Sequence, residues 1–148
     1  MTLARLDIGA RQTEVRTSSE VVQLALGSAL TAEAFFRHDP PTPTELESAI
    51  DGVEDEVMRV RQRLPGDAVL QAHGAALREV ADAAGVSDAL TLDAVEQLFQ
   101  RLASASLGNP VARHGLPAGK RFVATLLILR EFMHHLGFTA VRFGVASD

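Results

Sequence analysis

Two carboxylates near the N-terminus, Asp7 and Glu14, flank a short turn that begins at Gly9. Alternating apolar and polar residues predict a strand over residues 3–8 and a return strand over residues 13–17, so the turn closes a hairpin. A glycine turn after a strand lets backbone N–H groups surround a phosphate, while the neighbouring carboxylate holds a metal ion or a water molecule. The segment therefore indicates a phosphate-binding loop with Asp7 as its candidate metal ligand.

The loop departs from this function in its other residues, because Ala10, Arg11 and Gln12 carry side chains where close approach of a phosphate favours glycine. The Arg11 guanidinium could bind an anion bidentately, or it could be an exposed loop residue. A second glycine turn follows the strand predicted over residues 68–72. The candidate ligand-binding residues at the two turns are Gly9, Ala10, Arg11, Gln12, Thr13, His73 and Gly74.

Other polar groups have simpler interpretations. The Asp7 carboxylate could accept hydrogen bonds from the N–H groups of its own turn instead of holding a ligand. His134 and His135 are adjacent on a predicted helix and point about 100° apart, so they do not chelate as an i, i+4 pair would. The acidic run at residues 54–56 is expected to be a solvated helix face, with a metal site as the lesser alternative.

Composition limits the classes of function. The chain has 148 residues, 47% of them hydrophobic, which predicts one domain, 1–148, with a sizeable core. A formal charge of −5 disfavours nucleic acid and anionic membrane surfaces as partners. The absence of cysteine excludes disulfides and thiolate metal sites. No apolar run approaches a membrane-spanning length, and Asp7 lies too early for a secretory signal, so we expect a cytoplasmic protein.

Hydrophobic periodicity predicts an α/β fold. The predicted strands cover residues 3–8, 13–17, 21–26, 68–72 and 139–143. The predicted helices cover residues 31–36, 44–64, 75–84, a segment capped by Thr91, and 120–136. In the second of these helices, Thr44 and Glu47 match a capping box, and Leu46, Ile50, Val53, Val57, Val60 and Leu64 form one apolar stripe. We expect a mixed five-stranded sheet whose first three strands are antiparallel, with helices on both faces.

This order of elements resembles one half of the actin-like (ribonuclease H-like) ATPase fold. Residues 7–14, D-I-G-A-R-Q-T-E, are similar to the D-I-G-G-G-S-T-E loop of the exopolyphosphatase and guanosine pentaphosphate phosphatase (Ppx/GppA) family. Residues 26–33 and 39–47 are similar to its L-P-L-G-x-x-x-L-T-E, D-P-P-T and E-L-E sequence. Residues 72–75 stand where the family has V-G-G-T, residues 115–120 resemble its G-L-x-P-x-R, and residues 146–148 its V-S-D.

The resemblance covers only the second, C-terminal half of the family's catalytic core. Family members hydrolyse phosphoanhydrides with Mg²⁺ in a cleft between two halves, and the catalytic carboxylate comes from the preceding half. By resemblance, Asp7 and Glu14 would help to place a metal-bound water molecule or a phosphate, and they are the candidates for a catalytic role in this chain. His73 and Ala75 replace the family's glycine and threonine, and Phe122 stands where an acid is usual. These changes indicate a relaxed active site.

We therefore expect a non-catalytic module that binds a phosphorylated small molecule or polyphosphate, or that serves as an association domain. Half of a two-lobed fold has a face suited to being covered, which predicts a homodimer or a partner lobe. No cofactor is required in that case. Two alternatives stay open: a Mg²⁺-dependent phosphoanhydride hydrolase whose cleft is completed by a second subunit, and a chain that is part of a longer protein.

Overall fold

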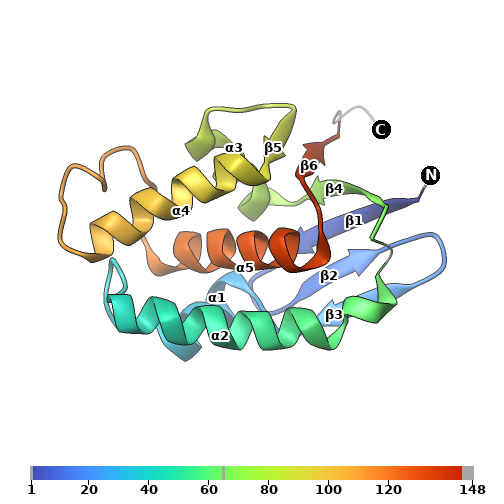
Figure 1. Cartoon of the computed structure of the whole chain (residues 1–148), viewed down its shortest axis with the longest axis horizontal. Helices are drawn as coiled ribbons and strands as arrows, with labels where there is room; N and C mark the ends of the chain where they lie inside the picture. Colours follow the sequence, from blue (N-terminus) through green and yellow to red (C-terminus); the bar gives the residue numbers. More distant parts are fainter. Residues whose placement is uncertain (1, 65, 145–148) are drawn as a thin grey trace.

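The computed structural model describes residues 2–64 and 66–144, which form one sheet and a layer of helices (Figure 1). The strands are β1 (Leu3–Ile8), β2 (Thr13–Arg16), β3 (Val21–Leu24), β4 (Val69–His73), β5 (Ala89–Thr91) and β6 (Ala140–Phe143). Their order in the sheet is β3-β2-β1-β4-β6-β5. The resemblance noted at residues 146–148 lies outside the described residues.

The sheet has six strands, so the predicted count of five is wrong by one. All five predicted strands are present, and β1, β2 and β3 are antiparallel as expected. The additional strand, β5, pairs antiparallel with β6 at the sheet edge. It has three residues, which is too short to show an alternation in the sequence.

The helices are α1 (Ser28–Phe35), α2 (Pro43–Arg59), α3 (Ala75–Ala84), α4 (Leu92–Ser106) and α5 (Lys120–Leu136), with a short 3₁₀ helix, η1 (Arg61–Arg63). Thr91 caps α4 as predicted, accepting a hydrogen bond from the backbone N–H of Ala94. Among the described residues, no helix is long and apolar enough to cross a membrane.

The N-cap of α2 is Thr42, and the prediction of Thr44 is wrong. The Thr42 hydroxyl accepts from the Glu45 N–H at 3.1 Å, and the Glu45 carboxylate accepts from the Thr42 N–H at 3.0 Å. The pattern Thr-x-x-Glu occurs twice in this segment, starting at Thr42 and at Thr44. Pro43 decides between them, because proline is favoured at the first helical position. With Pro43 at that position, the N-cap is the residue before it, Thr42.

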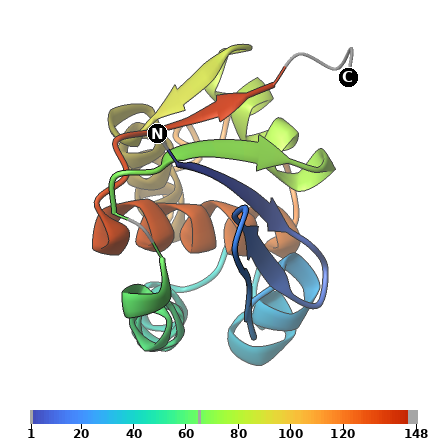
Figure 2. The ribbon, with the colours of Figure 1, turned by 90° about the vertical axis from the view of Figure 1, so that its right-hand side faces the viewer.

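The prediction of helices on both faces of the sheet is also wrong. Helices α1 to α4 all pack against α5, and α1, α2 and α5 lie below the strands in Figure 2. The connections from β3 to β4 and from β4 to β6 join parallel strands and move in the same direction along the sheet. Because such connections are right-handed, both place their helices on the same face.

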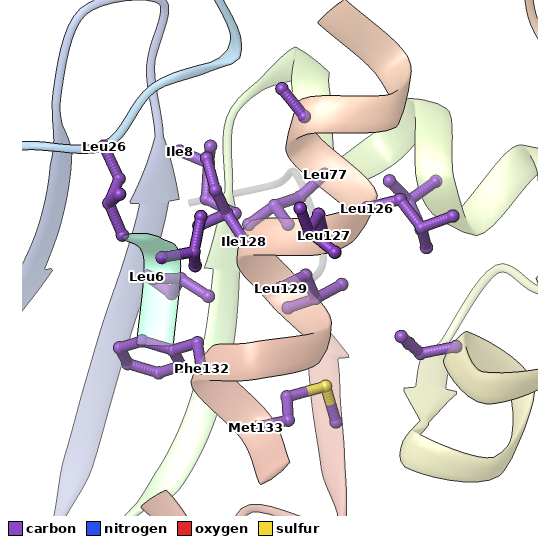
Figure 3. Close-up of a cluster of buried hydrophobic side chains, with 14 of the residues drawn as sticks. Leu6, Ile8, Leu26, Leu77, Leu126, Leu127, Ile128, Leu129, Phe132 and Met133 are labelled. Carbon is purple, nitrogen blue, oxygen red and sulfur yellow. The ribbon is translucent and has the colours of Figure 1, made fainter. Parts of the chain in front are cut away.

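The core lies between this face and α5. Ten of its buried side chains are labelled in Figure 3, and six of those belong to α5: Leu126, Leu127, Ile128, Leu129, Phe132 and Met133. The rings of Phe132 and Phe138 stack with their centroids 5.7 Å apart. Each such side chain contributes about 1.5–3 kcal/mol by leaving water. The apolar stripe predicted for α2 also faces this core.

The opposite face of the sheet, here called the open face, is not covered by any helix of the described chain. Every outward-pointing strand residue there is exposed or partly exposed, whereas its neighbours in sequence are mostly buried. The residues on this face are Leu3, Arg5, Asp7, Glu14, Arg16, Val21, Gln23, Val69, Gln71, His73, Ala89, Thr91, Ala140 and Arg142.

Candidate functional site

Three of the predicted site residues form a row across the open face. Asp7 on β1 lies opposite Glu14 on β2, and it is also paired with His73 on β4. Arg5 and Arg16 occupy the next outward positions and are opposite each other in the same register. These five side chains line a shallow pocket of about 290 Å³. The structure thus brings the two candidate carboxylates together with a histidine that is 66 positions beyond Asp7 in the sequence.

Charges of the same sign are therefore neighbours across the strands. Like charges directly opposite each other destabilise an antiparallel pair by a few tenths of a kcal/mol up to about 1 kcal/mol. Opposite charges follow each other along each strand, and Arg16 Nη2 donates to Glu14 Oε1 at 3.0 Å. The open face thus carries an acidic row, Asp7 and Glu14, beside a basic row, Arg5 and Arg16.

Gly74, in the second predicted turn, lies against the Asp7 carboxylate. Its φ of +103° is a conformation that favours glycine, and a β-carbon added there would lie 2.8 Å from Asp7 Oδ1. Gly74 is also the N-cap of α3, and no side chain caps that helix. The carboxylate, His73 and the first turn of α3 consequently occupy one end of the open face.

The loop from β1 to β2 is bonded to the start of α1. The carbonyl oxygens of Gly9 and Ala10 accept the backbone N–H groups of residues 28–30 at distances of 2.9–3.0 Å. Gly27 permits this contact, since a β-carbon there would lie 2.4 Å from the Ala10 oxygen. The N–H groups that a helix N-terminus would offer to a phosphate are thus already bonded within the chain.

The remaining loop residues have separate environments. Arg11 Nη1 donates to both carboxylate oxygens of Glu33 at 2.9 and 3.0 Å, and both side chains are 61% exposed. Thr13 is fully buried, and its hydroxyl donates to the Leu26 carbonyl at 3.0 Å, so its side chain faces the core. Ala10 and Gln12 are exposed.

Sequence reasoning missed two sets of residues. Arg5 and Arg16 were detectable from the period of two, since each lies two positions from a candidate carboxylate on its own strand. The second set is Glu54, Glu131 and His135, which is the one group among the described residues that brings three metal-ligating side chains within 4.8 Å. The sequence offers a metal site only as the lesser interpretation of residues 54–56, and it compares His135 only with His134, so the grouping of Glu54 with Glu131 and His135 was not predicted.

No protein-family model matches this sequence, and no curated protein matches it. Solved structures do match. A Ppx/GppA enzyme from Aquifex aeolicus superposes with a TM-score of 0.75 and 18% identity, over 97% of this chain and 53% of that chain. A second crystal structure of the Aquifex aeolicus phosphatase, its type II variant, gives a TM-score of 0.73 at 16% identity, over 97% of this chain and 53% of that one.

This chain has the fold of half a Ppx/GppA protein. An exopolyphosphatase from Cytophaga hutchinsonii shares it at a TM-score of 0.63 and 11% identity, again over 97% of this chain and 53% of that chain. The chain therefore spans about half the length of the Ppx/GppA structures that it matches. The fold predicted from the resemblance of residues 7–14 and 26–47 is confirmed, and it is consistent with the predicted C-terminal half.

Proposed function

We propose that this chain is a non-catalytic association module with the Ppx/GppA half-fold, and that a second copy of the chain covers its open face. The observation that carries the proposal is the uncovered sheet, on which the apolar side chains of Leu3 and Val21 are 51% and 39% exposed. The matched Ppx/GppA chains are about twice as long. In this proposal, a second copy buries the exposed apolar side chains of the sheet.

The charges of the open face support pairing between identical copies. The acidic row of Asp7 and Glu14 and the basic row of Arg5 and Arg16 run parallel, separated by two residues along the strands, or about 7 Å. A two-fold axis that lies parallel to the rows and midway between them places the acidic row of one copy over the basic row of the other. Self-complementary charge of this kind sets the orientation of a symmetric dimer.

The edge of the sheet at β3 is less suited to pairing than the open face. Glu56 Oε2 on α2 accepts the backbone N–H of Ala25 at 2.7 Å, and Arg59 Nη2 donates to the Gln23 carbonyl at 3.3 Å. An edge strand whose backbone groups are already bonded to side chains resists strand addition. This favours association through the face of the sheet.

Light scattering with charge-reversed variants tests the proposal. The wild type is expected to be a dimer at micromolar concentration. Arg5→Glu with Arg16→Glu, and Asp7→Lys with Glu14→Lys, should each give monomers, and an equimolar mixture of the two should recover dimers. Arg61→Glu, an exposed reversal on η1, is the control that leaves the dimer intact. A monomeric wild type, or dimers that survive both reversals, would overturn the proposal, provided that circular dichroism shows folded variants.

The second candidate function is phosphoanhydride hydrolysis in a cleft completed by the second copy. The observation that favours it is the pocket that holds both carboxylates and both arginines. Mg²⁺ in phosphate sites binds one or two carboxylates together with phosphate oxygens, so Asp7 and Glu14 fit its ligand chemistry. Arg5 and Arg16 would then bind the phosphate. Bound Mg²⁺ would supply charge neutralisation for the transferred phosphoryl group.

Phosphate release distinguishes the two candidates. Long-chain polyphosphate and guanosine pentaphosphate would each be incubated with the protein and Mg²⁺, and free phosphate would be assayed. The association module is expected to release none above the buffer rate. Release that disappears in Asp7→Asn and Glu14→Gln, but persists in Asp51→Asn on the exposed side of α2, would establish the hydrolase instead. Calorimetry of the same mixtures would detect binding without hydrolysis.

A further inference from the structure

A cluster of three metal-ligating side chains lies between α2 and α5, in the helical layer and away from the open face. His135 Nε2 is 3.0 Å from Glu131 Oε1 and 3.9 Å from Glu54 Oε2. The three ligand atoms all lie within 4.8 Å of one another. Helices α2 and α5 run side by side in Figure 1. Glu54 on α2 therefore faces Glu131 and His135 on α5.

The spacing along α5 suits chelation. Glu131 and His135 are separated by four positions, which is about one helical turn, so both side chains project from the same face. Two ligands at i and i+4 on a helix are a common arrangement in zinc proteins. Glu54 supplies a third ligand from the facing helix, and together the three residues leave room for a water molecule in a tetrahedral shell.

Glu131 is an unusual residue for its place in the core. Only 3% of it is exposed, on a helix whose other buried residues are apolar apart from Thr125. A buried carboxylate is costly unless positive charge faces it. Arg130 Nη1 donates to Glu131 Oε2 at 2.8 Å, which leaves Oε1 directed toward His135.

Arg130 is itself held by a second acid, because its Nε donates to Glu96 Oε1 on α4 at 2.5 Å. Its single positive charge is therefore shared between Glu96 and Glu131. Glu54 adds a third carboxylate to this group, and its ion pair among the described residues is the 3.9 Å contact with His135. The carboxylates of Glu54, Glu96 and Glu131 thus carry more negative charge than Arg130 and His135 can neutralise. This excess of negative charge favours a bound cation beside His135 Nε2.

We propose that Glu54, Glu131 and His135 bind a divalent transition-metal ion, with Zn²⁺ as the first choice. Zinc bonds to imidazole nitrogen and carboxylate oxygen are about 2.0–2.2 Å long, so its tetrahedral ligands lie roughly 3.3–3.6 Å apart. The ligand atoms are 3.0 Å and 3.9 Å apart in the two pairs that include His135 Nε2, and all three lie within 4.8 Å of one another, so side-chain movements of about an ångström bring them to that geometry. The Glu54 and His135 side chains are 43% and 21% exposed, so the ion can enter from solvent. The bound ion would cross-link α2 and α5 and stabilise their packing.

The test uses the full chain, first stripped of metal with a chelator. Zn²⁺ titrated by calorimetry should bind at one ion per chain, and Co²⁺ should give the visible absorption of a tetrahedral site. His135→Ala and Glu54→Gln should each weaken Zn²⁺ binding by about tenfold or more. Bound Zn²⁺ should also raise the melting temperature of the wild type and not that of His135→Ala.

Two matched controls lie beside the ligands. His134→Phe keeps an aromatic ring against His135, whose ring centroid is 4.9 Å away, but removes the neighbouring imidazole. Asp55→Asn removes the exposed carboxylate that follows Glu54. Both controls should bind Zn²⁺ like the wild type. Absence of binding at about 100 μM Zn²⁺, or equal losses in His134→Phe and His135→Ala, would overturn the proposal. Since Glu54 and His135 are partly exposed, their variants decide the question even if Glu131→Gln fails to fold.

Discussion

Asp7 on β1 lies directly opposite Glu14 on β2, and both carboxylates face the side of the sheet that no helix of the described chain covers. Two carboxylates in this register repel each other and destabilise the strand pair unless a positive charge lies nearby. Within the chain, Glu14 has Arg16, which donates to it at 3.0 Å. Asp7 also lies against Gly74 in the turn that follows β4.

Gly74→Ala should destabilise the protein by about 1–3 kcal/mol, because the new β-carbon meets Asp7 Oδ1 and the positive φ adds strain. Gly119→Ala is the matched control, because its φ of +111° and ψ of 150° are close to those of Gly74 and no atom lies within 4 Å of the added carbon. Urea unfolding of both variants separates the contact from the strain. If the two substitutions lower the free energy of unfolding by the same amount, the contact with Asp7 adds nothing to the cost at Gly74.

Gly27→Ala should cost about 1–3 kcal/mol through steric overlap alone. The φ of Gly27 is −168°, which any residue adopts, but the added β-carbon would lie 2.4 Å from the Ala10 carbonyl oxygen. The substitution should also loosen the hydrogen bonds between the loop and residues 28–30, which amide hydrogen exchange would detect as faster exchange there. Gly66→Ala, which has no neighbour within 4 Å, should leave the free energy of unfolding nearly unchanged.

Thr42→Ala should destabilise the protein by about 1 kcal/mol, because it removes the hydroxyl that accepts the Glu45 N–H. Thr44→Ala, two residues later and exposed, should change the free energy of unfolding by less than about 0.5 kcal/mol. Thermal or urea unfolding of the two variants compares them directly. The reverse ranking would place the cap at Thr44.

Stability should fall as the pH is lowered through the titration range of Glu45. Its hydrogen bond with His38 Nδ1, 3.0 Å long, is the main cause that lowers the pKa of Glu45 to about 2 from its ordinary value of 4.5. Hydrogen bonds from the backbone N–H groups of Thr42 and Arg37 act in the same direction. A lowered folded-state pKa gives stability that is present above pH 4.5 and is lost as the pH falls toward 2.

Denaturant unfolding between pH 2 and pH 6 measures this contribution, with Glu45→Gln as the comparison. The free energy of unfolding of the wild type should exceed that of the variant most at pH 6 and approach it near pH 2. A difference between the two proteins that does not change with pH would show that the charge of Glu45 contributes nothing.

Most of the elements could be predicted from local patterns. The patterns over residues 3–8 and 13–17 predicted β1 and β2, which cover Leu3–Ile8 and Thr13–Arg16, because side-chain direction in a strand has a period of two. The apolar stripe in α2 likewise predicted which face of that helix meets the core. The resemblance of the Asp7 to Glu14 loop to Ppx/GppA sequences predicted a fold that the solved structures confirm.

Features that depend on long-range pairing could not be predicted in the same way. The sequence by itself determined the hairpin and the amphipathic helices, since each follows from residues within a few turns or strand positions. Only the tertiary structure decided that all helices share one face, because that depends on the direction of two crossover connections. It also decided that Asp7 meets Gly74 and that Glu54 meets His135, because contacts between residues so distant in sequence form only when the sheet and the helices pack together.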